Sequence, residues 1–198
     1  MPVPRPVRIV HTSDVHFGAY STRAESSTND RRHLIETAFS RVIDLANAES
    51  AAALLIAGDF FDNDRVGQDV VDFAIAQLRR YAGPKFLIPG NHDPMDEGRI
   101  YSRHDLEAAV PGLRIIREHG GEFVEADGLD LVIWGRAYHD SDWHFKPLEG
   151  LPERLDSRWH IAMAHGHYVP DVGCASFSRN VLTMSLRCSV VRRPFSDM

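Results

Sequence analysis

The chain has 198 residues, which predicts one domain with room for a short appendage. Its hydrophobic and charged fractions, 43% and 25%, are those of a globular protein and exclude a disordered, collagen-like or coiled-coil chain. The net charge of −6 excludes a basic protein that coats DNA, but not an enzyme that meets phosphate through bound metal ions.

The same sequence bears on the compartment. No apolar run approaches the roughly 18 residues needed to cross a bilayer, so no membrane partner is expected. The N-terminal residues lack the pattern of a secretory signal. Two cysteines, Cys174 and Cys188, are too few for a disulfide framework or a four-thiolate zinc site. We therefore expect a cytoplasmic protein.

The first half of the chain alternates between strand-like and helix-like patterns. Short apolar runs are separated by segments in which apolar residues recur at helical spacing. Asn29 or Asp30 can cap the first helix, and Gly83-Pro84 ends the second. Such alternation predicts parallel strands with right-handed crossovers. The expected strands are residues 7–10, 53–57 and 85–88, and the expected helices are 31–49 and 68–81.

The second half changes character, because it contains short strand-like runs without long helices between them. Asp127-Gly128 is a dipeptide typical of a hairpin turn. This half therefore predicts a second, more antiparallel sheet. Its expected strands are residues 113–116, 122–125, 129–134 and 161–164.

The last 28 residues differ again in charge and composition. Segment 171–198 carries a net charge of +2, which leaves −8 for the rest, and it contains both cysteines and no histidine. We therefore divide the chain into a core, 1–170, and an atypical C-terminal tail, 171–198. Two interpretations stay open: a native terminus that lies along the surface, or a premature ending through a truncation or a shifted reading frame.

Four short polar motifs carry the chemistry, and each follows a predicted strand. In open α/β sheets the ligand crevice lies beyond the carboxyl ends of the strands, so four such motifs can converge. Each motif alone is weak, since such residues are common in turns and on surfaces. Their joint occurrence in this order favours a metal site over coincidence. The motifs are Asp14-Val15-His16, Gly58-Asp59, Gly90-Asn91-His92-Asp93 and His165-Gly166-His167.

The residue types indicate what such a site would hold. Asp14 and His16 are two residues apart, so in an extended segment they would point the same way and share one ion. The carboxylate of Asp59 has two oxygens and can bridge two ions. Asn91 and His165 offer a carbonyl oxygen and an imidazole, whereas His92 would point toward substrate. Oxygen and imidazole ligands without thiolate suit two divalent ions, with Mn²⁺ the first choice and Fe or Zn²⁺ as alternatives.

The same motifs carry a family resemblance over about residues 7–169. Together with the opening His11-Thr12-Ser13-Asp14-Val15-His16-Phe17-Gly18, they resemble the calcineurin-like metallophosphoesterase superfamily, and specifically its SbcD-type DNA repair exonuclease branch. The resemblance implies an α/β fold, a two-sheet αββα sandwich. It implies that Asp14 and His16 bind the first metal, that Asp59 bridges, and that Asn91 and His165 bind the second. His92 would be the catalytic histidine.

One departure from the family pattern concerns its last motif. The pattern ends in Gly-His-x-His, yet no histidine follows His167, so the fold is expected to be incomplete at the C-terminus. His165-Gly166-His167 has the His-x-His spacing, but Ala164 stands where the glycine should be. The distance of 73 residues from His92 favours the earlier, single histidine of the family. Each metal would then have three protein ligands.

These observations predict a two-metal phosphoesterase that acts on phosphodiesters, with DNA as the first candidate substrate. Relatives of this branch often dimerise and pair with an ATPase, so the resemblance implies a homodimer and an ATPase partner as candidates. The alternatives are a small-molecule phosphodiesterase, a protein phosphatase, and a truncated, non-catalytic homologue that binds metal. The missing final motif is the observation that motivates the last of these.

Overall fold

A computed structural model describes residues 6–19, 25–126, 128–140, 142, 144–153 and 156–166, with the backbone alone described for residues 25–30. The tail 171–198, both cysteines and His167 lie outside the described residues. Among the helices of the described part, none is both long and apolar enough to cross a membrane.

The first sheet has four strands in the order β1-β2-β3-β4, and every neighbouring pair is parallel. The predicted parallel sheet is therefore confirmed. The strand predicted at 113–116 belongs to this sheet as β4, so its assignment to the second sheet was wrong. The strands are β1 (Ile9–Thr12), β2 (Ala53–Ala57), β3 (Lys85–Ile88) and β4 (Leu113–Ile115).

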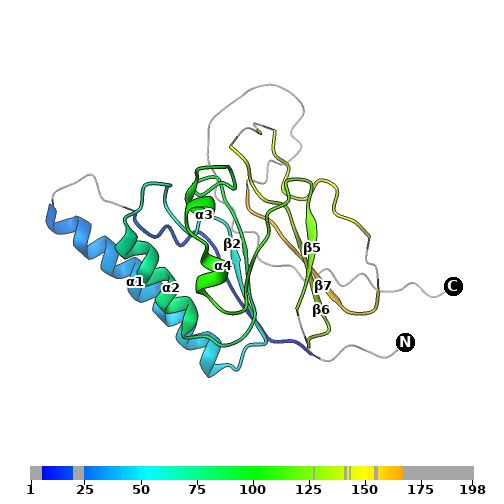
Figure 1. Ribbon diagram of the computed structural model, residues 1–198. Helices are drawn as coiled ribbons and strands as arrows, with labels where there is room; N and C mark the ends of the chain where they lie inside the picture. The colour runs from blue at the N-terminus through cyan, green and yellow to red at the C-terminus, as the bar shows by residue number, and fades with distance from the viewer. Residues whose placement is uncertain are drawn as a thin grey trace, which may run out of the picture.

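Two long helices cross between these strands. They are α1 (Glu25–Ala48) and α2 (Gln68–Arg79), and they lie side by side over one face of the first sheet (Figure 1). Two single-turn helices, α3 (Ile100–Arg103) and α4 (Leu106–Ala109), connect β3 to β4. Neither helix was predicted from the sequence, because a single turn is too short to show helical periodicity. The Asp105 side chain caps α4 by accepting from the Ala108 amide at 3.0 Å.

The second sheet has the order β5-β6-β7. The predicted hairpin joins β5 (Glu122–Glu125) to β6 (Leu131–Gly135), and these two strands are antiparallel. The strand β7 (Trp159–Met163) pairs with β6 in parallel, so the sheet is mixed and only half of it is antiparallel.

The core lies in two layers because alternate residues of a strand face opposite sides of a sheet. Leu54 and Ile56 of β2 pack with the helices, whereas Ala53 and Leu55 pack against Ile161 and the other inward residues of the second sheet. The order of layers is therefore helices, first sheet, second sheet (Figure 1). This arrangement confirms the two-sheet α/β class; among the described residues, no helix covers the outer face of the second sheet.

Candidate metal centre

The loops that follow β1 and β2 run side by side beyond the carboxyl ends of their strands. The Asp14 amide donates to the Gly58 carbonyl at 3.1 Å, and the His16 amide donates to the Asp59 carbonyl at 2.9 Å. Next along the chain, the Phe17 amide donates to the Phe60 carbonyl at 2.9 Å. This ladder brings the first two polar motifs together and fixes their register.

A cluster of four buried phenylalanine rings packs beneath the polar ends of these two loops, on the side of the core. The ring of Phe17 meets the rings of Phe39 and Phe60 edge to face, with centroids 5.1 Å apart in both cases. Phe60 also meets Phe61 at 4.9 Å, and all four rings are fully buried. Burial of a phenylalanine side chain stabilises a fold by about 1.5–3 kcal/mol. The residues next to His16 and Asp59 are thus held by packing, which fixes the positions of the polar side chains on the opposite side of these loops.

The backbone in these loops adopts an uncommon conformation. Asp14 and His16 both have φ of 54°, and Asp59 has φ of 51°. Positive φ is rare outside glycine and costs about 1–3 kcal/mol where the surrounding structure enforces it. The expectation that Asp14 and His16 share an extended segment is therefore wrong. Their side chains still gather around Asp59, through left-handed turns rather than through strand alternation.

Two glycines allow the motifs to approach each other closely. A Cβ atom on Gly90 would lie 2.1 Å from Asp59 Oδ1, and one on Gly58 would lie 2.1 Å from His165 Cγ. Gly58 also has φ of 79°, which favours glycine on conformational grounds. A side chain at either position would therefore keep the motifs apart.

The first group of possible ligands consists of Asp14, Asp59 and His165, whose donor atoms lie within 4.8 Å of one another. His165 Nδ1 lies 3.0 Å from the Ala57 carbonyl, which can only accept, so Nδ1 carries the hydrogen. The opposite ring atom, Nε2, lies 3.4 Å from Asp59 Oδ2 and 3.3 Å from Asn91 Oδ1. A carboxylate, an amide oxygen and an imidazole nitrogen therefore face one another.

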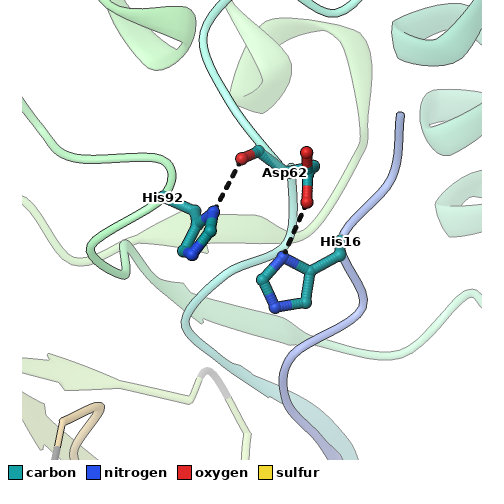
Figure 2. Close-up of side chains that lie close together, drawn as sticks. All are labelled: His16, Asp62 and His92. Atoms are coloured by element: carbon teal, nitrogen blue, oxygen red, sulfur yellow. Dashed lines mark hydrogen bonds and ion pairs between the residues drawn. The ribbon is translucent and has the colours of Figure 1, made fainter. Parts of the chain in front are cut away.

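The second group consists of His16, Asp62 and His92 (Figure 2). His16 Nδ1 lies 3.2 Å from Asp62 Oδ1, although without hydrogen-bond alignment. His92 Nδ1 lies 2.8 Å from the main-chain oxygen of Asp62, and the two imidazole rings meet edge to face at 4.7 Å. His16 Nε2 is also 3.6 Å from Asp59 Oδ2. Asp59 is thus the residue that lies between the two groups.

Several of these atoms fit metal ligation better than ordinary hydrogen bonding. Asp14 Oδ1 and His16 Nδ1 are buried without a hydrogen-bond partner within the described part of the chain. Buried polar atoms are normally paired, and an unpaired one costs about 1–3 kcal/mol. A divalent cation would satisfy such lone pairs and would also offset the close approach of several acceptor atoms. The residues present therefore fit divalent ions with oxygen and imidazole ligands.

The charges around Asp59 favour its ionised form. Asp59 is only 4% exposed, and this burial alone would raise its pKa. The hydrogen bond and charge of His165, with the His92 amide that donates to Oδ1 at 3.0 Å, outweigh burial and hold the pKa of Asp59 below its usual value. Burial lowers the pKa of His165, but the Asp59 carboxylate outweighs it and leaves the pKa raised. The carboxylate is thus ionised and ready to bind cations.

A fully buried carboxylate, Asp93, holds the third motif in place. Its Oδ1 accepts from the Gly90 amide at 2.7 Å, and its Oδ2 accepts from the Phe61 amide at 2.9 Å and from the Tyr101 hydroxyl. Burial raises the pKa of Asp93 to about 6, although these three donors act in the opposite direction. Asp93 therefore ties the loop after β3 to the loop after β2.

The structure thus brings five predicted ligand residues and His92 to one end of the two sheets. Asp14, Asp59, His165 and Asn91 form one cluster, and His16 lies between Asp59 and Asp62. Asp62 and Tyr101 also belong to this arrangement, outside the predicted set of ligands. The sequence signal for Asp62 is its position three residues after Asp59, beyond the two phenylalanines of the same loop.

Comparison with known proteins agrees with this geometry. Residues 7–187 match the family model of the calcineurin-like phosphoesterases, which is most of the chain. The chain belongs to this family. The match continues into the segment 171–198 that the sequence analysis set apart. Members are phosphoester hydrolases that depend on two metal ions, which is the coarse class that the site residues predicted.

Individual relatives are more distant. Over 105 residues, 51% of the chain, it is 30% identical to the DNA double-strand break repair protein Mre11 of Sulfolobus acidocaldarius, and the match spans 26% of that protein. Among solved structures, nuclease MPE of Pseudomonas putida shares 21% identity with a TM-score of 0.39, over 64% of this chain and 52% of the other. The protein of unknown function AQ665 from Aquifex aeolicus shares 18% identity with a TM-score of 0.32, and the match covers 70% of this chain and 64% of AQ665.

Proposed function

We propose that this chain hydrolyses phosphodiesters at a two-metal centre whose ligands are Asp14, His16, Asp59, Asn91 and His165. The observation that carries the proposal is the position of Asp59, whose Oδ2 lies 3.4 Å from His165 Nε2 and 3.6 Å from His16 Nε2. One buried carboxylate between two imidazoles from different motifs is the arrangement that a bridging ligand requires. The family resemblance assigns Asp14 and His16 to the first ion and Asn91 and His165 to the second. In the structure Asp14 lies with Asp59 and His165, so its carboxylate is the ligand whose assignment to one ion the metal-binding experiments have to test.

In this proposal the metal ions and His92 have separate roles in hydrolysis. Bound divalent ions would supply Lewis-acid stabilisation of the phosphoryl oxygens and lower the pKa of water. His92 is exposed, and its Nδ1–H donates to the Asp62 main-chain oxygen, which fixes the ring and leaves Nε2 facing outward. In its protonated form, Nε2–H can give its proton to the leaving oxygen or steady the negative charge of the transition state.

DNA is the substrate class that we propose to test first, with Mn²⁺ as the metal. The support is the partial match to a protein named for DNA double-strand break repair, together with the SbcD-like motifs. A role in DNA repair, a cytoplasmic location, a homodimer and an ATPase partner belong to the same proposal. So does the division into a core, 1–170, and a tail, 171–198. A small-molecule phosphodiesterase and a non-catalytic homologue are the competing functions.

The deciding experiment measures metal content and hydrolysis on the same preparation. Protein purified with Mn²⁺ is analysed for bound metal and is then offered single-stranded DNA, double-stranded DNA and bis(p-nitrophenyl) phosphate. We expect two ions per chain, hydrolysis of the chromogenic diester and cleavage of DNA. Cleavage of the diester without DNA favours the small-molecule enzyme, whereas two bound ions without any hydrolysis favour the non-catalytic homologue.

A further inference from the structure

A cavity of about 270 Å³ opens directly beside the candidate metal centre. Asp62, Asn91 and His92 belong both to the candidate metal centre and to the cavity lining, and Asp64, Arg99 and Asp140 form much of the rest of that lining. Its volume is close to the lower end for ligand pockets, about 300 Å³, so it suits one nucleoside-sized group rather than a strand. A substrate bound at the metal centre would extend into this cavity.

The part of the cavity lining away from the metal centre, called the wall below, consists of Asp64, Arg99 and Asp140. Ion pairs and hydrogen bonds hold these side chains in place. The Arg99 guanidinium pairs through one nitrogen with Asp64 and through the other with Asp140 at 2.5 Å. The Asp140 amide in turn donates to Asp96 Oδ2 at 2.8 Å, which ties the loop after β6 to the loop after β3. The Met95 amide strengthens the same tie by donating to the Tyr138 carbonyl at 2.8 Å.

The charge of this wall is negative. Two carboxylates, those of Asp64 and Asp140, lie in its lining with a single guanidinium, that of Arg99. Asp62 lines the cavity as well, but its carboxylate lies 3.2 Å from His16 Nδ1, on the side of the metal centre. Because Arg99 pairs with both Asp64 and Asp140, one positive charge is set against two negative ones, and the three side chains together are negative. Hydroxyl and amino groups can donate to these carboxylates. The phosphate that binds the metal ions is held by their charge, whereas a second phosphate placed against Asp64 and Asp140 would be repelled.

The position of His92 determines which part of a substrate enters the cavity. His92 lines the cavity and is the residue to which we assign proton transfer to the leaving oxygen, so this inference rests on the proposed function. We infer that the cavity receives the leaving alcohol of the phosphodiester, and that Asp64 and Asp140 select a leaving alcohol without a further phosphate. The preferred substrates are then small diesters, or nucleic-acid ends whose released terminal nucleoside has a free hydroxyl.

The reaction balances without any additional reagent. The oxygen of water forms a bond to phosphorus, the bond from phosphorus to the leaving oxygen breaks, and His92 supplies the proton that the leaving oxygen takes up. The products are a phosphomonoester and an alcohol. The proton lost by water goes to solvent, and His92 takes a proton back from solvent before the next turnover.

The test compares three thymidine substrates with the full chain in Mn²⁺: TpT, pTpT with an extra 5′-phosphate, and TpTp with an extra 3′-phosphate. The product, a 5′- or a 3′-monophosphate, identifies the bond that is cut and therefore the nucleoside that leaves. We expect a phosphate on the leaving nucleoside to lower kcat/KM by about tenfold or more, because a dianion then faces a negative wall. The same phosphate on the other nucleoside should change kcat/KM by less than about threefold.

Asp140→Asn tests the wall itself, and Asp72→Asn is its matched control. Asp72 is exposed on α2 and does not line the cavity. Asp72→Asn therefore changes the net charge of the protein by the same amount as Asp140→Asn without changing the wall. Asp140→Asn should reduce the discrimination against a phosphate on the leaving nucleoside by about threefold or more, whereas Asp72→Asn should leave it unchanged. Thermal unfolding checks that both variants fold.

The outcomes separate this inference from the proposed function. Equal kcat/KM for TpT and for the substrate with phosphate on its leaving nucleoside overturns the inference alone. Discrimination that Asp140→Asn and Asp72→Asn affect equally overturns the role of the wall. If none of the dinucleotides is cut and bis(p-nitrophenyl) phosphate is also inert, the proposed function fails and the inference fails with it.

Discussion

Gly90 offers a sharp test of how the site is held together. A Cβ atom at this position would lie 2.1 Å from Asp59 Oδ1 and 2.4 Å from the Asp59 amide nitrogen, whereas real Cβ atoms essentially never approach closer than 3.0 Å. Gly90→Ala therefore has to push the Asp59 carboxylate and its backbone away by about 1 Å. Such overpacking costs about 1–3 kcal/mol of unfolding free energy.

The same displacement should weaken metal binding, because it moves the residue that we propose as the bridge. We expect Mn²⁺ affinity to fall by at least about tenfold, the lower end of what changes around a metal ligand cost. Urea unfolding in chelator measures the stability effect, and calorimetric titration with Mn²⁺ measures the affinity.

Gly120→Ala is the matched control for this substitution. A Cβ on Gly120 meets no atom within 4 Å, and Gly120 does not have positive φ. This variant should be neutral, or more stable by about 0.4–1 kcal/mol through the reduced entropy of the unfolded chain. If Gly90→Ala behaves like Gly120→Ala in both assays, the close approach of the two loops is not what positions Asp59.

Three further substitutions test individual roles. Asp59→Asn should weaken both metal positions together by about 100-fold or more, because a bridging carboxylate is shared by both ions; retention of two ions at wild-type affinity would refute the bridge. His92→Ala should keep its metal and lose about 10²-fold or more in turnover, and loss of metal from the folded variant would instead make His92 a ligand beside His16 and Asp62. Tyr101→Phe should lower the unfolding free energy by about 1–2 kcal/mol in urea, because the buried Asp93 carboxylate loses a donor; an unchanged midpoint would show that its two backbone donors suffice.

The fold was predictable from the sequence where the information is local. The buried runs 53–57 and 85–88 coincide with β2 and β3, because consecutive apolar residues between turn signals are typical of parallel strands covered on both faces. The strand at 113–116 was found, but its sheet was not. Membership in a sheet depends on pairing with β3, a contact between distant residues that no local pattern records.

The site shows the same division. The convergence of the motifs after β1, β2, β3 and β7 was predictable because ligand sites of open α/β sheets lie beyond the carboxyl ends of the strands. The ligand types follow from the residues themselves. The left-handed backbone at Asp14 and His16 did not follow, because non-glycine residues rarely adopt it and only the surrounding packing enforces it. The contacts of Asp62 and Asp140 also depended on loops whose paths the sequence does not encode locally.

The central claim is that Asp59 bridges two ions, and Mn²⁺ electron paramagnetic resonance tests it most directly. Protein titrated with Mn²⁺ should take up two ions per chain and give the spectrum of a spin-coupled pair, as expected for ions about 3.5–4 Å apart. Asp59→Asn should abolish this coupling, whereas Asp72→Asn should keep it. A single bound ion, or two ions whose spectra are the sum of isolated Mn²⁺ sites, would contradict the account.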